Sequence, residues 1–117
     1  MAELRVMLPT VLTVLAPSEV CDRVEAPEGA VLLRVAPREV LILGASPSDL
    51  TTASGALVDD VSDAWVSLVL EGAEAPQAFA RLSELELPTQ GWIQGEVAHA
   101  AAKVLVEADR ITMLVPS

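Results

Sequence analysis

Hydrophobic residues recur along this chain in short runs separated by proline, glycine and polar residues, a pattern typical of β-strands. The first two runs, Leu4 to Leu8 and Thr10 to Leu15, are separated by Pro9. Proline has no N–H to donate to a neighbouring strand, so we expect a break or a sheet edge there. A third run, Trp65 to Leu70, is apolar at nearly every position. That composition favours a strand in the interior of its sheet.

Two pairs of runs predict β-hairpins. Ala30 to Val35 and Val40 to Gly44 are joined by a short polar turn that contains Pro37. Val97 to Glu107 and Ile111 to Val115 form the second pair, with a turn at residues 108–110. Proline presets φ for an early turn position, and the short connections suit antiparallel neighbours.

Three segments predict helices. Residues 18–25 begin with Ser18 as a candidate N-cap. Ser46 is a second candidate N-cap, with Pro47 at the first helical position of a short helix ending near Gly55. Serine and proline are favoured at these two positions. The longest helix is expected over residues 73–85, because Phe79, Leu82 and Leu85 lie on one face of such a helix. Residues 86–95, which include one proline and two glycines, are expected to be a loop.

These elements predict an α+β fold: a mostly antiparallel sheet with helices packed on one face. The expected order, starting from the hairpin at residues 30–44, is β-β-α-β-α-β-β, and residues 1–29 with their two short runs are expected to be an N-terminal addition to it. The layering is economical, because each helix covers an apolar sheet face. A chain of 117 residues has the usual size of one domain, so we predict a single domain over residues 1–117.

The formal net charge of −10 bears on the partners of the chain. Nucleic acids and anionic membranes attract Lys and Arg, so we expect neither as a partner. From Glu39 up to Arg81 the chain has seven acidic residues and no basic one. Such a negative stretch serves solubility or docking to a basic partner. The single cysteine, Cys21, cannot form an internal disulfide, which fits a cytoplasmic protein, and we expect it to be a small buried residue.

The residues that could carry chemistry are few. His99 is the only histidine, lies in an Ala-rich run, and is expected to be a strand residue and not a catalytic base. A metal site built on His and Cys needs more than one of each. Asp59, Asp60 and Asp63 lack the spacing of a calcium loop, so we interpret them as a turn or helix-cap cluster. We therefore predict no catalytic residue, no metal site and no independent enzymatic activity.

The two tryptophans are the candidate recognition residues. Trp65 lies in the apolar run and is expected in the core. Trp92, beside Ile93, lies in the expected loop between Gly91 and Gly95. An aromatic side chain on a loop can anchor an interface or cover the edge of a core, and the sequence leaves both open. Trp92 and Ile93 are the candidate partner interface.

Three blocks resemble the gamma subunit of heterotetrameric sarcosine oxidase, a family related to the folate-binding domain of the glycine-cleavage aminomethyltransferase. They are LLRVAPREVLIL (32–43), VDDVSDAWVSLVLEGAEAPQAFARL (58–82), and the stretch from ELPTQGWIQGEVAHAAAKVLV to ITMLVPS, so the resemblance covers about residues 30–117. It implies an aminomethyltransferase-like half-domain. Folate-handling relatives carry a Gly-Gly-Ile-Asp-Asp-like turn in the later hairpin, where this chain has HAAAKVLVEAD. No catalytic carboxylate is carried over.

The resemblance implies a non-catalytic subunit of a folate-linked, amine-oxidising oxidoreductase complex. Its partners would be larger subunits, and flavin and tetrahydrofolate would reside on those subunits, with no cofactor bound by this chain. The alternative is a stand-alone homodimer that binds a small, flat, pteridine-like molecule in a pocket between sheet and helix. The scarcity of aromatic residues, 3% of the chain, counts against this alternative, since flat rings usually lie against aromatic or apolar walls.

Overall fold

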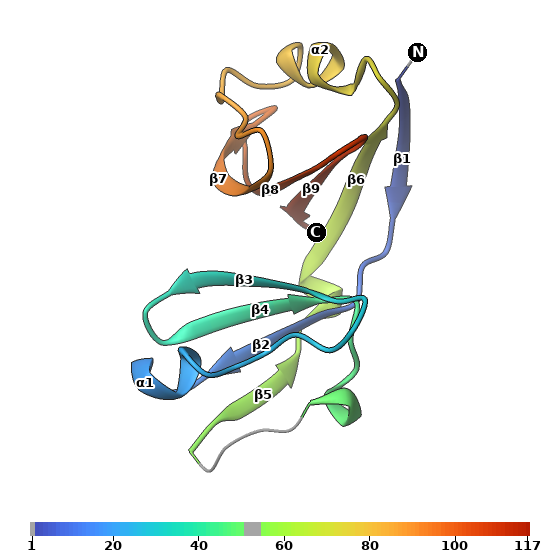
Figure 1. Cartoon of the computed structure of the whole chain (residues 1–117). Coiled ribbons are helices and arrows are strands. Elements are labelled where there is room, and N and C mark those ends of the chain that lie inside the picture. Colours follow the sequence, from blue (N-terminus) through green and yellow to red (C-terminus); the bar gives the residue numbers. More distant parts are fainter. Residues whose placement is uncertain (1, 51–54) are drawn as a thin grey trace. The chain divides into compact units, whose positions relative to one another are not determined.

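The computed structural model describes residues 2–50 and 55–117, and the chain forms two compact units. Unit 1 consists of Met1–Leu8 and Asp63–Ser117, and unit 2 of Pro9–Ser62. Each unit contains one antiparallel sheet (Figure 1). The α+β class with mostly antiparallel strands is confirmed, but the strands form two sheets where one was expected. That residues 1–117 act as one domain stays a prediction.

Unit 1 contains a five-stranded sheet in the order β1-β6-β9-β8-β7. The strands are β1 (Glu3–Met7), β6 (Trp65–Glu71), β7 (Gly91–Val97), β8 (Ala100–Glu107) and β9 (Arg110–Pro116), and every neighbouring pair is antiparallel. β6 lies between β1 and β9, which confirms the interior position that its apolar composition predicted. The expected hairpin of the last two strands is β8–β9, paired from Lys103↔Leu114 to Glu107↔Arg110.

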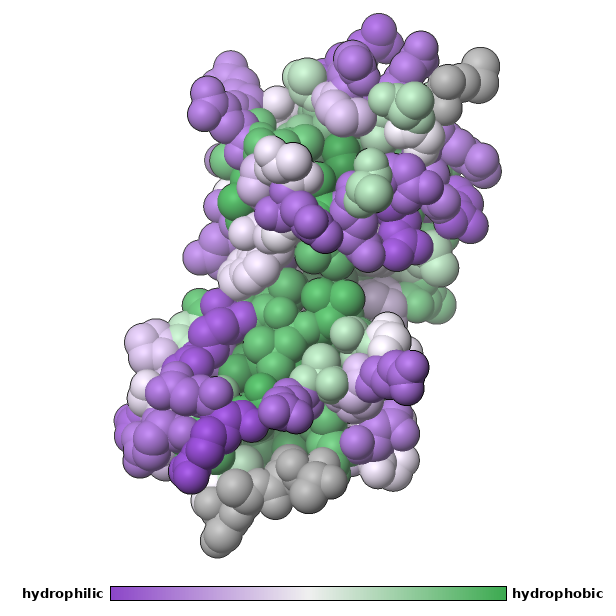
Figure 2. Space-filling view, in the orientation of Figure 1, coloured by the Kyte–Doolittle hydropathy of each residue, from purple (hydrophilic) through white to green (hydrophobic). Residues whose placement is uncertain are grey.

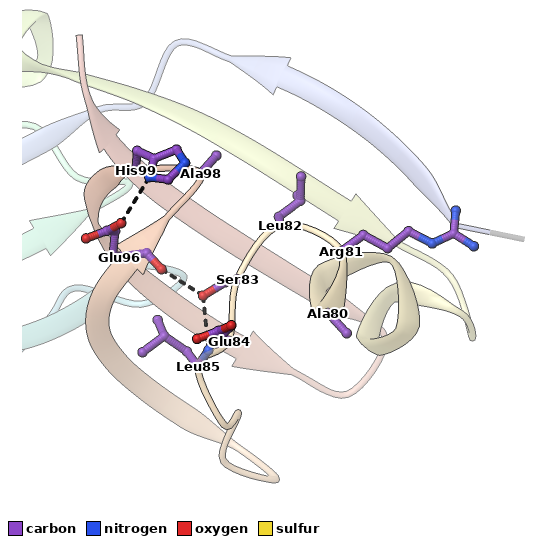
Figure 3. Close-up of a pocket in the computed structure, with 9 residues that line it drawn as sticks. All are labelled: Ala80, Arg81, Leu82, Ser83, Glu84, Leu85, Glu96, Ala98 and His99. Atoms are coloured by element: carbon purple, nitrogen blue, oxygen red, sulfur yellow. Dashed lines mark hydrogen bonds and ion pairs between the residues drawn. The ribbon is translucent and has the colours of Figure 1, made fainter.

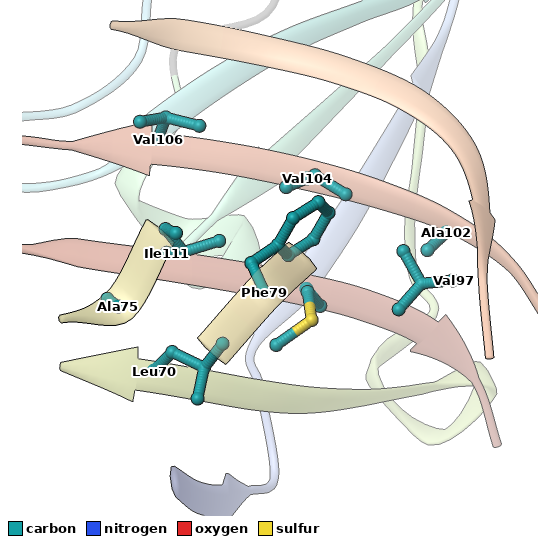
Figure 4. Close-up of a cluster of buried hydrophobic side chains, with 9 residues drawn as sticks. Leu70, Ala75, Phe79, Val97, Ala102, Val104, Val106 and Ile111 are labelled. Atoms are coloured by element: carbon teal, nitrogen blue, oxygen red, sulfur yellow. The ribbon is translucent and has the colours of Figure 1, made fainter. Parts of the chain in front are cut away.

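Helix α2 (Ala75–Ala80) covers one face of this sheet. Figure 4 shows Phe79 among side chains of β6, β8 and β9, and Phe79 is only 1% exposed. The expected helix over residues 73–85 is wrong in length. Pro76 stands in the first turn, which proline tolerates, but the helix ends at Ala80. Leu82 and Leu85 still pack against the same core from the segment that follows.

Strand β7 occupies part of the stretch expected to be a loop. The expected strand 97–107 is also divided, because Ala98 and His99 form a two-residue turn with positive φ values of 47° and 68°. Two positive φ values are typical of the tight turns that join antiparallel strands, where Asn and Gly are the usual residues. Ala98 and His99 give no such signal, so the turn could not be recognised from the sequence.

Unit 2 contains a four-stranded sheet in the order β3-β4-β2-β5. Its strands are β2 (Val11–Leu15), β3 (Val31–Ala36), β4 (Glu39–Leu43) and β5 (Leu57–Asp60). The predicted hairpin β3–β4 is confirmed, with a register shift between Arg34 and Ala36. β5 was not predicted, because two of its four residues are aspartates. The core of this unit contains Leu12, Val14, Val40, Ile42 and the buried Cys21, as expected for that cysteine.

The helices of unit 2 are single turns. α1 spans Ser18–Cys21 and is capped by Pro17, so Ser18 is its first residue and not its N-cap. The 3₁₀ turn η1 (Pro47–Asp49) is capped by Ser46, as predicted, and the Ser46 N–H and hydroxyl both donate to Asp49 Oδ2, at 2.8 and 3.0 Å. These bonds lower the pKa of Asp49, chiefly through the backbone N–H. Leu50 is extended, which ends the turn early; residues 51–54 of the expected helix lie outside the described residues.

The visible surface combines hydrophilic and hydrophobic residues. Figure 2 shows hydrophilic residues toward the borders of each unit and a broad hydrophobic area over the middle of the visible face of unit 2. Within residues 2–50 and 55–117, the structure contains no helix with the length and apolar character needed to cross a lipid bilayer.

Candidate partner interface

The two candidate interface residues lie on β7, an edge strand of unit 1 and not a loop. Trp92 is opposite Leu105 and Ile93 is opposite Val104. Successive residues of a strand point to opposite faces of the sheet. Ile93 packs against the core beneath α2, so Trp92 points to the other face, and both side chains are partly buried. The two residues therefore have different roles: Ile93 belongs to the core, and Trp92 is the one that faces away from it.

Only some of the outward-facing backbone groups of β7 form hydrogen bonds. In a two-residue hairpin the flanking residues, here Val97 and Ala100, form a hydrogen-bonded pair. Alternate residues of β7, namely Glu96, Gln94 and Trp92, then turn their N–H and C=O groups outward. The Glu96 carbonyl accepts a bond of 2.7 Å from the Ser83 hydroxyl. In the part of the chain that the structure describes, no hydrogen bond reaches the outward backbone groups of Gln94 and Trp92.

Next to this edge, the outer face of β7 and β8 is hollowed. A groove of about 750 Å³ is lined by Trp65, Gln94, Gly95, Glu96, His99, Ala101, Ala102, Lys103 and Pro116. Lys103 Nζ lies 5.4 Å from the centre of the Trp65 ring and 3.4 Å from Gln94 Oε1. Trp65 was expected in the core, but its side chain is only partly buried and its ring lies beside the Lys103 ammonium group. The groove thus combines an aromatic ring, a cation and a carboxylate.

A second hollow, of about 680 Å³, lies between the segment after α2 and the β7–β8 turn (Figure 3). The Ser83 hydroxyl donates to the Glu96 carbonyl and accepts from the Leu85 N–H at 3.1 Å. His99 Nδ1 is 3.3 Å from Glu96 Oε1, and the two side chains are 98% and 70% exposed. Contrary to expectation, His99 is a turn residue and not a strand residue. The Ser83 hydroxyl holds the backbone, and this arrangement does not form a nucleophile–base pair.

The aspartate cluster holds a turn. Asp60 accepts bonds from the Ser62 hydroxyl at 2.6 Å and from the Ser62 N–H at 3.0 Å. The hydroxyl bond is the larger cause that lowers the pKa of Asp60. The Asp63 carbonyl accepts from the Ser117 hydroxyl at 2.8 Å. The turn interpretation is confirmed for Asp60, and residues 2–50 and 55–117 contain no group of three or more His, Cys, Asp or Glu placed to share a metal ion.

The edge strand β7 was missed although the sequence contains a signal for it. Ile93, Gly95 and Val97 alternate with Trp92, Gln94 and Glu96. This period of two is the strand pattern. Glycines at both 91 and 95 favoured a loop and hid the alternation.

Comparison with known proteins supports the architecture. No family model matches the chain, and no curated protein matches its sequence. The chain has a two-sheet α+β fold with antiparallel strand pairs. A chain of heterotetrameric sarcosine oxidase from Corynebacterium sp. U-96, solved in complex with pyrrole 2-carboxylate, superposes with a TM-score of 0.76. The match covers 98% of this chain and 75% of the other at 18% sequence identity, so the resemblance predicted from the sequence is confirmed at the level of the fold.

Proposed function

We propose that this chain is a non-catalytic subunit of a sarcosine-oxidase-like, folate-linked, amine-oxidising complex. The observation that supports this most is the fold shared with a chain of a heterotetrameric enzyme. The candidate site agrees with it, since the Ser83 hydroxyl bonds backbone groups and His99 pairs with Glu96 as an exposed side chain. In this proposal flavin and tetrahydrofolate reside on larger partner subunits, and the chain is a cytoplasmic protein that binds neither.

The docking surface in this proposal is the outer face of β7 and β8 around Trp92. Trp92 points away from the helix-covered core, and its neighbour across the strand pair, Leu105, is also apolar and partly buried. Tryptophan is enriched among the few residues that dominate binding energy. The free backbone groups of Trp92 and Gln94 add hydrogen-bonding capacity at the same edge.

Replacement of Trp92 by alanine tests this surface. We expect Trp92→Ala to weaken association with a larger subunit by about 30-fold or more, equivalent to about 2 kcal/mol for an interface anchor. The measurement is the affinity of the purified chain for the partner that co-purifies with it and is identified by mass spectrometry. The melting temperature of the free chain should change little.

Ile93→Ala is the matched control, because Ile93 is adjacent on the same strand but packs on the core. It should lower the melting temperature more than Trp92→Ala does. If Trp92→Ala unfolds the chain, Trp92 is a structural residue. If the variant binds as tightly as the original chain, the interface lies elsewhere.

A second candidate function is a stand-alone homodimer that binds a pteridine-like molecule. A pocket of about 510 Å³ favours it, and this pocket lies between α2 and the β8–β9 turn, as that hypothesis requires. Its walls include Pro76, Leu87, Val106 and Ile111, but none of its lining residues is aromatic. The volume falls in the range of ligand sites, whereas the absence of an aromatic wall weakens the case.

A thermal-shift series with tetrahydrofolate and folate separates the two functions. A ligand at 100 times its dissociation constant stabilises the folded chain by about 2.7 kcal/mol, which raises the melting temperature by several degrees. The main proposal predicts no shift for the isolated chain. A saturable shift that Val106→Trp abolishes, by filling the pocket, would favour the binding function.

A further inference from the structure

Four of the described strands lie at sheet edges, and three of them carry features that discourage further pairing. An unprotected edge presents free N–H and C=O groups to any other strand, so proteins shield edges with charges, bulges, short strands or covering segments. β5 has only four residues and includes Asp59 and Asp60. β3 has a register shift at Arg34, and Arg34 Nη1 lies 2.8 Å from Asp22 Oδ1. The end of β7 is covered by the Leu82–Ser83 segment, through Ala98 N–H to Leu82 O at 2.9 Å and the Ser83–Glu96 bond.

The fourth edge strand, β1, has five residues, two of them charged, but it has no register shift and, among the described residues, no covering segment. Its pairing with β6 runs without a shift from Glu3 to Met7, and all five of its residues are exposed. Leu4 is 54% exposed and Val6 68%. The one basic residue, Arg5, forms an ion pair with Glu71 on the adjacent strand β6. Its charge is therefore directed toward the sheet and does not hinder a further strand from pairing with β1. Figure 1 shows β1 as the outer strand beside β6.

We propose that β1 receives an added β-strand from the larger partner subunit. This inference rests on the proposed function and names a second contact of the same complex. Strand addition to an exposed edge uses backbone hydrogen bonds for affinity and alternate side chains for specificity. The added strand would place aliphatic side chains beside Leu4 and Val6, which share one face of the sheet. On the other face it would place a basic side chain opposite Glu3.

Charge and area favour a partner subunit over a second copy of this chain. Two copies would each carry a net charge of −10 and repel one another. A five-residue strand also buries far less than the roughly 1,200–2,000 Å² of a stable interface. β1 therefore needs a partner that is held at a further surface as well. In the proposed complex, the face around Trp92 provides that surface.

The test compares Val6→Lys with Leu57→Lys. Leu57 is a matched control because it is an apolar residue on another edge strand, β5, and is 61% exposed. The complex is isolated from source cells with the tagged full chain, and its subunits are identified by mass spectrometry. We expect Val6→Lys to weaken association by about 10-fold or more and Leu57→Lys by less than 2-fold. Both variants should keep the melting temperature of the free chain, since both side chains are exposed.

Hydrogen–deuterium exchange of the unmodified chain gives an independent readout. In the complex, the β1 amides should exchange at least 10-fold more slowly than in the free chain. If the complex forms, the β1 amides exchange equally fast and Val6→Lys binds normally, the β1 proposal is wrong while the proposed function stands. If the chain is recovered alone, the proposed function fails, and the β1 proposal fails with it. A homodimer that Val6→Lys dissociates would identify a second copy as the occupant and overturn the assignment to a partner subunit.

Discussion

At the scale of single residues, Gly95 shows how the absence of a side chain positions another. A Cβ atom at this position would lie 2.5 Å from Leu85 Cδ2 and 2.8 Å from Cδ1. Leu85 packs against the core of unit 1 from outside the helix, and it does so over the backbone of β7. The glycine therefore leaves space for the Leu85 side chain and does not adopt a positive φ. In the sequence it resembles a loop glycine, because nothing local indicates that Leu85, ten positions earlier, will lie on it.

Substitution of Gly95 measures this contact. We expect Gly95→Ala to destabilise the chain by about 1–3 kcal/mol, the usual cost of forcing extra atoms into a packed site. Chemical denaturation measures the change. Leu85→Ala removes the side chain that would clash, so Gly95→Ala should cost much less in that background. Equal costs in the two backgrounds would mean that Leu85 moves aside freely and that Gly95 is not constrained by it.

At the scale of elements, the sequence pattern was sufficient where apolar runs were unbroken. β2, β4, β6 and β9 were predicted, and so were the hairpin β3–β4 and the cap at Ser46. The misses have physical causes. Helix α2 is shorter than its apolar stripe, because Leu82 and Leu85 reach the core from an irregular segment. The helical spacing of the apolar residues correctly predicted which residues are buried, but it did not predict where the helix ends.

The candidate interface was predictable only in part, for a similar reason. Trp92 was singled out as an aromatic residue on an expected loop, but its placement on an edge strand depends on the β7–β8 turn. That turn is formed by Ala98 and His99 with positive φ, a conformation that costs a non-glycine residue strain. Tertiary contacts hold it, since Ala98 N–H donates to Leu82 O. Local sequence rules cannot register a turn that is stabilised by a distant segment.

At the scale of the whole molecule, the route of the chain could not be predicted from local patterns. Unit 1 is built from both ends of the chain, because β1 pairs with β6, and unit 2 lies between them in sequence. The two ends of unit 2 are bonded to one another. Val11 N–H donates to Ser62 Oγ at 2.9 Å across 51 positions, and Val61 N–H donates to Val11 O at 2.9 Å. Folded unit 2 thus closes the long loop that joins β1 to β6.

This closure predicts that the two units unfold together, as a single domain would. When unit 2 unfolds, β1 is joined to β6 by a flexible loop of about 50 residues, whose closure costs about 3–4 kcal/mol. β1 is a short edge strand and should then detach. Ile42→Ala removes a fully buried side chain from the core of unit 2 and should destabilise that unit by about 2–5 kcal/mol.

Hydrogen exchange measured residue by residue tests the coupling. In Ile42→Ala, the amides of β1 should exchange faster by the same factor as those of β2 and β4. The exposed substitution Leu57→Ala should leave β1 unchanged. Calorimetry of the unmodified chain should show one transition whose van't Hoff and calorimetric enthalpies agree. Two separate transitions, or β1 amides that stay protected while β2 and β4 exchange, would show that the units are independent domains. In that case the stability of the β1–β6 pairing would not depend on whether unit 2 is folded.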